Sequence, residues 1–87
     1  MGSHSWEGVS EQIFECVKAK SKKDHGTVYE PPEGDSGIAK TETAVGKVVL
    51  KFNLSGEKLS YAIVEKPWIV TESEIWDGIG EAIDSCR

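Results

Sequence analysis

Residues 47–65 read KVVLKFNLSGEKLSYAIVE, and this stretch decides the fold. Apolar and polar side chains alternate along it on both sides of a central SGEK segment at residues 55–58. A period of two is typical of a strand with one buried face, and the central segment has the composition of a turn. We therefore predict a β-hairpin with strands over residues 41–54 and 59–65, one apolar face and one mixed face.

A helical stripe of apolar residues precedes the hairpin, and it predicts a helix over residues 6–23 that ends before Gly26. The stripe consists of Trp6, Val9, Ile13, Cys16 and Val17. Lysines gather at the end of this helix, at positions 18, 20, 22 and 23. They suit the negative end of the helix dipole, and a site for an anion or a partner is the alternative interpretation.

A second helical stripe follows the hairpin and predicts a helix over residues 72–86. Thr71 and Glu74 have the spacing of a capping box at its start. Gly78 and Gly80 each cost such a helix about 1 kcal/mol relative to Ala. They indicate either a close approach to another element or a helix that depends on tertiary packing. The stripe consists of Ile75, Ile79, Ala82, Ile83 and Cys86.

The segment between the first helix and the hairpin carries weaker signals. Residues 27–30 have the composition of a short third strand, and the Pro- and Gly-rich segment 31–41 is expected to form a loop. The element order predicts an α+β fold, with a small antiparallel sheet and the N- and C-terminal helices packed on one of its faces. Residues 1–4 read as the remnant of an expression tag and are left out of the fold reasoning, which leaves a single domain over residues 5–87.

The two cysteines, Cys16 and Cys86, occupy stripe positions on different predicted helices. If both helices cover the same face of the sheet, the two thiols meet, whereas the alternative is two reduced cysteines in the core. We favour a disulfide, which closes a loop of about 70 residues and stabilises the domain by roughly 4 kcal/mol. Such a bond indicates an extracellular, periplasmic or secretory-pathway protein, and we favour a secreted, extracellular one. The N-glycosylation sequon Asn53-Leu54-Ser55 agrees with secretion.

Composition limits the choice of partners. The formal net charge of −5 opposes binding to nucleic acid, which requires a cationic surface. No apolar run approaches the ~20 residues that a membrane span needs. A structural zinc site needs about four Cys or His ligands, and the acidic residues around the segment 30–35 lack the spacing of a calcium loop. We therefore expect neither a metal site nor a cofactor.

The aromatic residues give the remaining functional signal. Trp68 and Trp76, and with them Tyr29, are candidate binding residues, although filling the core is the alternative for each. We hypothesise a small secreted, non-enzymatic binding domain, similar to an effector, toxin or inhibitor, that recognises a protein or a small ligand. One alternative is a small secreted hydrolase that uses His25 with a carboxylate. The other is an intracellular oligomeric accessory subunit, and a homodimer is left open.

Overall fold

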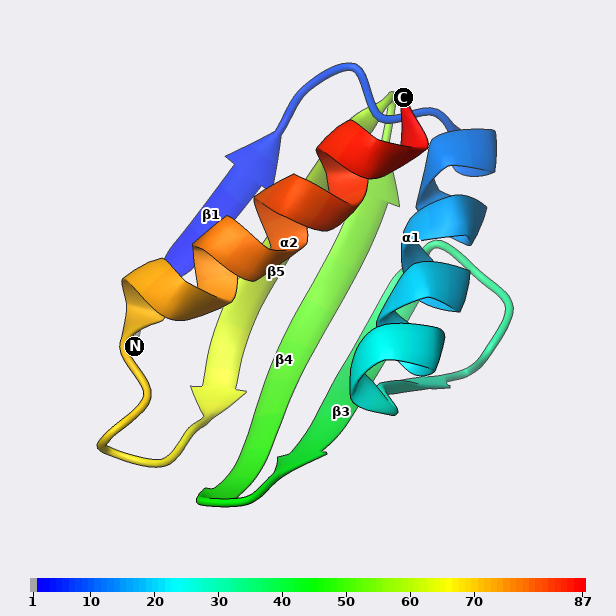
Figure 1. The fold of residues 1–87 in the computed structure, drawn as a ribbon. Coiled ribbons are helices and arrows are strands. Elements are labelled where there is room, and N and C mark those ends of the chain that lie inside the picture. The colour runs from blue at the N-terminus through cyan, green and yellow to red at the C-terminus, as the bar shows by residue number, and fades with distance from the viewer. Residues whose placement is uncertain (1) are drawn as a thin grey trace.

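The computed structural model describes residues 2–87, which form a five-stranded antiparallel sheet and two helices (Figure 1). The spatial order of the strands is β1-β5-β4-β3-β2. The predicted mixed α+β class is therefore confirmed, with more strands than the sequence indicated. The elements are β1 (Ser3–Trp6), α1 (Glu11–His25), β2 (Val28–Glu30), β3 (Ser36–Thr43), β4 (Gly46–Ser55), β5 (Lys58–Glu65) and α2 (Glu72–Cys86).

The hairpin at the centre of the sheet is confirmed, but its first predicted strand is in fact two strands. β4 pairs with β5 around the predicted turn, where Ser55 lies opposite Lys58. The chain reverses a second time between Thr43 and Gly46, so residues 41–43 belong to β3. Gly46 has φ 137°, a conformation that other residues rarely adopt, and the Thr43 hydroxyl donates to the Gly46 carbonyl across this turn.

The prediction of a loop over residues 31–41 is wrong in part, because β3 begins at Ser36. β3 pairs with β4 over its whole length and also pairs with β2, which is the short strand expected near residues 27–30. Lys18 holds the remaining loop against α1. Its ammonium group donates to the carbonyl oxygens of Pro32 at 3.4 Å and Gly34 at 3.0 Å, and it lies 4.4 Å from the centre of the Phe14 ring. This lysine is buried in the middle of α1, and the basic residues of the last turn are Lys22, Lys23 and His25. The predicted helix-capping role is therefore wrong for Lys18, which serves packing.

The N-terminal helix is shorter than predicted. Trp6 lies in β1, and α1 starts only after Ser10, whose side chain accepts a hydrogen bond from the Ile13 amide at 3.2 Å. Gly8, with φ 71°, separates the strand from the helix cap. β1 pairs with β5 through Ser3, His4, Ser5 and Trp6, so the fold includes residues that the sequence analysis left aside.

The buried face of α1 is also rotated from the predicted stripe. Phe14, Val17 and Lys18 are its buried residues, whereas Cys16 is exposed to solvent. The predicted disulfide nevertheless forms, because Cys86 at the end of α2 lies beside Cys16 with a Cα–Cα distance of 5.8 Å. The bond therefore joins two helices that lie side by side at the surface and not within the core (Figure 1).

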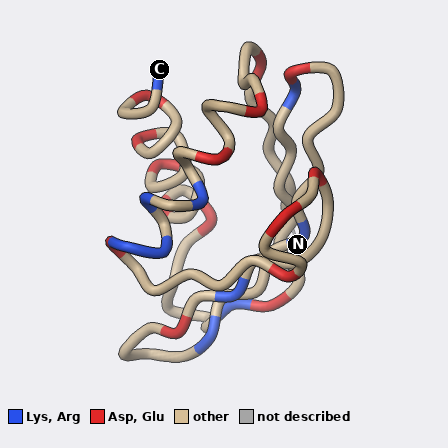
Figure 2. The backbone as a smooth tube through the Cα atoms, turned by 90° about the vertical axis from the view of Figure 1, so that its right-hand side faces the viewer, with Lys and Arg blue, Asp and Glu red and all other residues tan. Residues whose placement is uncertain are grey.

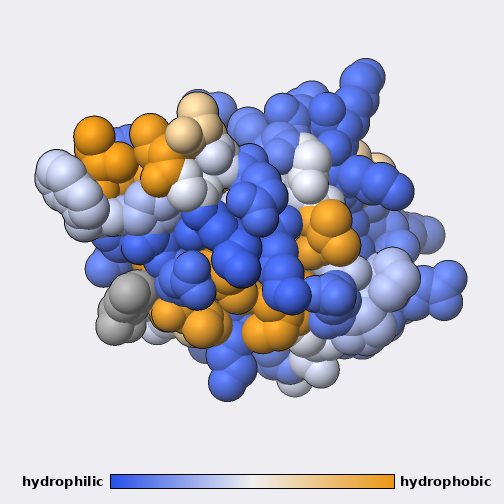
Figure 3. All heavy atoms as spheres, turned by 90° about the horizontal axis from the view of Figure 1, so that it is seen from below, coloured by the Kyte–Doolittle hydropathy of each residue, from blue (hydrophilic) through white to orange (hydrophobic). Residues whose placement is uncertain are grey.

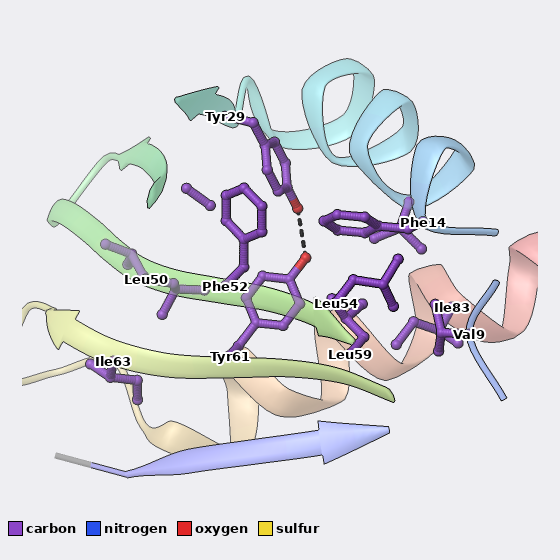
Figure 4. Packing of buried hydrophobic residues seen from close by; sticks show 13 residues of the cluster. Val9, Phe14, Tyr29, Leu50, Phe52, Leu54, Leu59, Tyr61, Ile63 and Ile83 are labelled. Atoms are coloured by element: carbon purple, nitrogen blue, oxygen red, sulfur yellow. Dashed lines mark hydrogen bonds between the residues drawn. The ribbon is translucent and has the colours of Figure 1, made fainter. Parts of the chain in front are cut away.

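The core is built around two buried tyrosines. The hydroxyl groups of Tyr29 and Tyr61 are 2.8 Å apart, and Figure 4 shows them pointing toward one another. The Phe52 ring packs against both tyrosine rings, and the Phe14 ring packs against Phe52 at 5.5 Å. Aliphatic side chains fill the rest of this cluster: Val9, Val17, Ala39, Val48, Leu50, Leu54, Leu59, Ile63 and Ile83.

The tyrosine pair predicts how the protein responds to alkali. Burial raises the pKa of Tyr29 and raises the pKa of Tyr61 well above its ordinary value. Below about pH 10 both hydroxyls are protonated in the folded and unfolded states, so they do not make stability depend on pH. Above it the unfolded chain ionises first, and the free energy of unfolding falls as the pH rises through the raised pKa values.

Absorbance at 295 nm measures this directly, because the chain has only these two tyrosines. We expect the folded protein to show less tyrosinate at about pH 10 than a denatured sample, in which half of the tyrosine has ionised at that pH. Ionisation should then coincide with the loss of the near-ultraviolet circular dichroism signal. Half-ionisation near pH 10 with an unchanged circular dichroism spectrum would contradict the buried pair.

Candidate functional site

A groove separates α1 from α2, and strands β3 and β4 form its floor. Its volume is about 440 Å³, which lies within the usual range of about 300–1,000 Å³ for ligand sites. The apolar residues that line it come from the sheet, from α2 and from the segment that precedes α2. They are Val48, Leu50, Val70, Ile75, Ile79 and Ala82.

The rim of the groove is polar and carries charges of both signs. Lys20 and Asp24 on α1 form an ion pair at 3.5 Å, and His25 ends the same helix. Glu74 and Glu81 line the side formed by α2, a helix that has five acidic residues and no lysine or arginine. The groove thus has an acidic wall opposite a wall of mixed charge.

The basic residues within residues 2–87 lie in several separate groups. Figure 2 shows them in several short stretches of the chain, interspersed with acidic ones. Among the four clustered lysines, Lys18 is buried and Lys20 is paired with Asp24.

Gly78 in α2 lines the groove and leaves room in it. A Cβ atom placed at this position would have no other atom within 4 Å, so the space beside the helix is open. Gly80, the other glycine of α2, would place a Cβ 3.6 Å from the Trp6 indole nitrogen, which is ordinary packing distance. Of the two alternatives for these glycines, close approach to another element fits Gly80, whereas Gly78 faces open space and does not fit a close approach.

Residues 66–70, which we name the Trp68 loop, lie at one end of the groove. Trp68 is 90% exposed and Ile69 is 55% exposed, whereas Val70 lines the groove two residues further on. The loop is held by a bond from the Lys66 ammonium group to the Val70 carbonyl at 2.7 Å. Two strongly exposed apolar side chains thus directly precede a residue that lines the apolar cavity.

A further exposed apolar side chain lies near this loop. Val45, at the tip of the β3–β4 turn, is 55% exposed, and the following Gly46 lies against the Pro67 ring, which a Cβ there would approach to 2.8 Å. Figure 3, which views this end from below, shows hydrophobic residues in separate groups among hydrophilic ones. The end of the molecule therefore offers individual apolar anchors and no broad apolar surface.

The three candidate binding residues occupy different environments. Only Trp68 is fully available to a partner. Trp76 is half-buried, with its ring 6.1 Å from that of Trp6 and 5.8 Å from that of His4. Tyr29 lies in the core, bonded to Tyr61. None of the three lines the groove, but Trp68 lies two residues before Val70, which does.

Sequence reasoning missed the groove itself. The apolar stripe of α2 predicted a helix and no cavity, but Ile75 and Ile79 are only half-buried, and both line the groove together with Gly78. The available signal was a glycine within an otherwise regular amphipathic helix. His25, the only histidine outside the first four residues, is exposed and shares the groove with Asp24 and Glu74.

Neither a membrane-spanning helix nor a cluster of metal ligands is found within residues 2–87. No helix in this part of the chain is long and apolar enough to cross a membrane. Nor do the described residues include a group of three or more His, Cys, Asp or Glu side chains that could hold a metal ion. In comparisons with known proteins, no family model, curated protein or solved structure matches the chain.

Replacing Gly78 with Ala should stabilise the protein. The new methyl group enters open space, and the helix loses a glycine that costs about 0.5–1 kcal/mol relative to alanine. Chemical denaturation followed by circular dichroism should show a free energy of unfolding that is higher by this amount. Gly26→Ala is the matched control, because that site is equally uncrowded but has φ 69°, and it should destabilise by about 1 kcal/mol. Stabilisation by both changes, or by neither, would contradict this description of α2.

Proposed function

We propose that this chain is a small secreted, non-enzymatic binding domain that recognises a partner protein. The observation that carries the proposal is the 90% exposed side chain of Trp68 at the end of a groove with an apolar lining. Tryptophan is among the residues that contribute most to protein interfaces, where it fills pockets that exclude water. Exposing it on a free domain has no stabilising effect, so contact with a partner is its best explanation.

The proposal includes an architecture in which both helices cover the same face of the sheet. Phe14 and Val17 of α1 and Ile83 of α2 belong to the same core cluster as the inward side chains of β4 and β5. The Cys16–Cys86 bond keeps the two helices adjacent, and Figure 1, in which both lie in front of the strands, supports this layout. The groove is then the space left between them where α2 has a glycine and not a larger side chain.

Secretion is supported by the disulfide. Disulfides persist in oxidising compartments and are rare in reducing ones, and this bond joins residues 70 positions apart in a chain of 87. Small secreted domains often rely on such bonds because their cores are limited in size. An extracellular location therefore accounts for the bond better than the alternative of an intracellular accessory subunit.

The groove indicates the chemistry of the partner. Its lining would accept apolar side chains, and Glu74 and Glu81 on the α2 wall would attract Lys or Arg residues next to them. Asp77 and Asp84 extend the acidic surface of the same helix. We therefore propose a partner segment with apolar residues that enter the groove and basic residues that flank them.

A random peptide library displayed on phage, selected against the disulfide-bonded domain, tests this proposal. We expect the selected peptides to be apolar and flanked by Lys or Arg. Trp68→Ala should weaken their binding at least about tenfold, because it removes an interface anchor. Gly78→Leu should do the same by placing a side chain in the groove, as isothermal titration calorimetry would measure.

Two control variants separate binding from folding. Gly78→Ala changes the same position without filling the groove, and Val28→Ala removes an exposed apolar side chain on the edge strand β2. Both should leave the affinity of the peptides nearly unchanged. Peptides that bind equally well to Trp68→Ala and Gly78→Leu would refute the site, and light scattering would show whether a second copy of the domain occupies it instead.

The hydrolase hypothesis has one observation in its favour, since His25 shares the groove rim with Asp24, Glu74 and Glu81. Under our proposal His25 is a surface residue without a catalytic role. Hydrolysis of p-nitrophenyl acetate by the wild type and by His25→Ala should therefore occur at the same slow rate. A rate that falls at least about tenfold in the variant, with the circular dichroism spectrum unchanged, would favour the hydrolase over the binding domain.

A further inference from the structure

The face of the sheet that points away from the core cluster is hollowed. A depression of about 660 Å³ lies over strands β1, β5, β4 and β3. A row of small polar residues crosses it in register, because Ser5 pairs with Ser60, Ser60 with Asn53, and Asn53 with Ser36. The hydroxyl groups of Ser5 and Ser60 are 3.0 Å apart. The hollow exists because these neighbouring positions carry short side chains.

Asn53 lies in the middle of this row, on β4, the central strand of the sheet. It is the only asparagine in the chain, and Leu54 and Ser55 complete an N-glycosylation sequon with it. The strand register decides which way the asparagine points. Phe52 and Leu54 are buried in the core, so Asn53 between them is turned outward, and its side chain is exposed.

We propose that Asn53 carries an N-linked oligosaccharide in the secretory pathway of a eukaryotic cell. The donor is an oligosaccharide linked to a lipid pyrophosphate. The Asn53 amide nitrogen bonds to C1 of the first sugar and loses one proton, while the bond from C1 to the pyrophosphate oxygen breaks and the lipid pyrophosphate leaves. The sequence alone supplies the acceptor triplet, whereas the structure shows that a glycan there is compatible with the folded domain.

The depression provides room for the first sugars. Residues beside Asn53 in the row are serines, whose short side chains leave space above the sheet and whose hydroxyl groups can bond to sugar hydroxyls. A large side chain at position 60 or 36 would fill this space. The glycan would cover the outer face of the sheet, and it would leave the groove between the helices free for a partner.

This inference requires the proposed secretory compartment but not the proposed groove function, so the two can fail separately. The wild-type protein should be secreted from a cultured eukaryotic cell line and analysed by intact mass before and after digestion with peptide N-glycosidase. We expect a single glycan, whose removal converts Asn53 to aspartate. Asn53→Gln and Ser55→Ala should each abolish it, and Ser55→Thr should retain it.

Ser55→Ala keeps Asn53 in place, and it therefore distinguishes loss of the sequon from loss of folding. The proposal is overturned if the secreted, disulfide-bonded wild type carries no glycan, or if a glycan persists in Ser55→Ala. Peptides selected on the unglycosylated domain should bind the glycosylated protein with the same affinity. A loss of at least about tenfold would place the glycan over the groove and not on the opposite face, contrary to the inference.

Discussion

The disulfide between Cys16 and Cys86 is the constraint on which the rest of this small domain depends. It joins the helix that follows the first strand to the last helix, so almost the whole sheet lies in the loop that it closes. In the chain-entropy model a loop of this size contributes about 4 kcal/mol, which is comparable with the whole net stability of many small domains. Because the bond fixes α1 beside α2, it also defines the two walls of the groove. The same covalent bond thus stabilises the domain and positions the walls of the proposed binding site.

Hydrogen bonds between buried polar groups also help to fix the arrangement of the core. The Tyr29 and Tyr61 hydroxyls satisfy each other in a cluster that is otherwise apolar, and a buried hydroxyl left without a partner would cost about 1–3 kcal/mol. Lys18 is a second buried polar group with partners, because its ammonium group lies over the Phe14 ring and donates to the carbonyl oxygens of Pro32 and Gly34. These two contacts fix the edge strand β2 and the following loop, where few aliphatic side chains are available.

The sequence predicted those features that depend on local pattern. The hairpin around residues 55–58, the cap formed by Thr71 and the extent of α2 are all confirmed, because alternation and capping are short-range signals. The disulfide between Cys16 and Cys86 was also predicted. The prediction assumed that Cys16 faces the core, however, and in the structure Cys16 lies at the surface. Strand β1 was missed because residues 1–4 were left out of the fold reasoning and Trp6 was assigned to the first helix. Strand β3 was missed in part, because residues 36–40 were assigned to a loop and become a strand by pairing with β4 of the strong hairpin. Tyr29 was a candidate for binding, yet its place in the core depends on Tyr61, 32 residues away, which no local pattern reveals.

The candidate groove could not be predicted from the sequence either, because it too depends on contacts between residues far apart in the chain. It is the space between two helices, and its existence depends on how far apart the disulfide and the sheet hold them. Gly78 was visible in the sequence, but only the structure shows that the space beside it is open. Trp68 was recognised as a candidate, and its exposed position at the end of the groove follows from the short Trp68 loop that links β5 to α2.

The most direct test of this account is the free energy of unfolding with and without the disulfide. Urea denaturation of the oxidised protein should be compared with that of the Cys16→Ala/Cys86→Ala double variant, followed by tryptophan fluorescence. The account predicts a loss of about 4 kcal/mol, which leaves the variant largely unfolded without denaturant. Because Cys16 is exposed, reduction of the wild type should give the same result. A variant within about 0.5 kcal/mol of the oxidised protein would show that the helices hold their places without the bond, and would contradict the central claim.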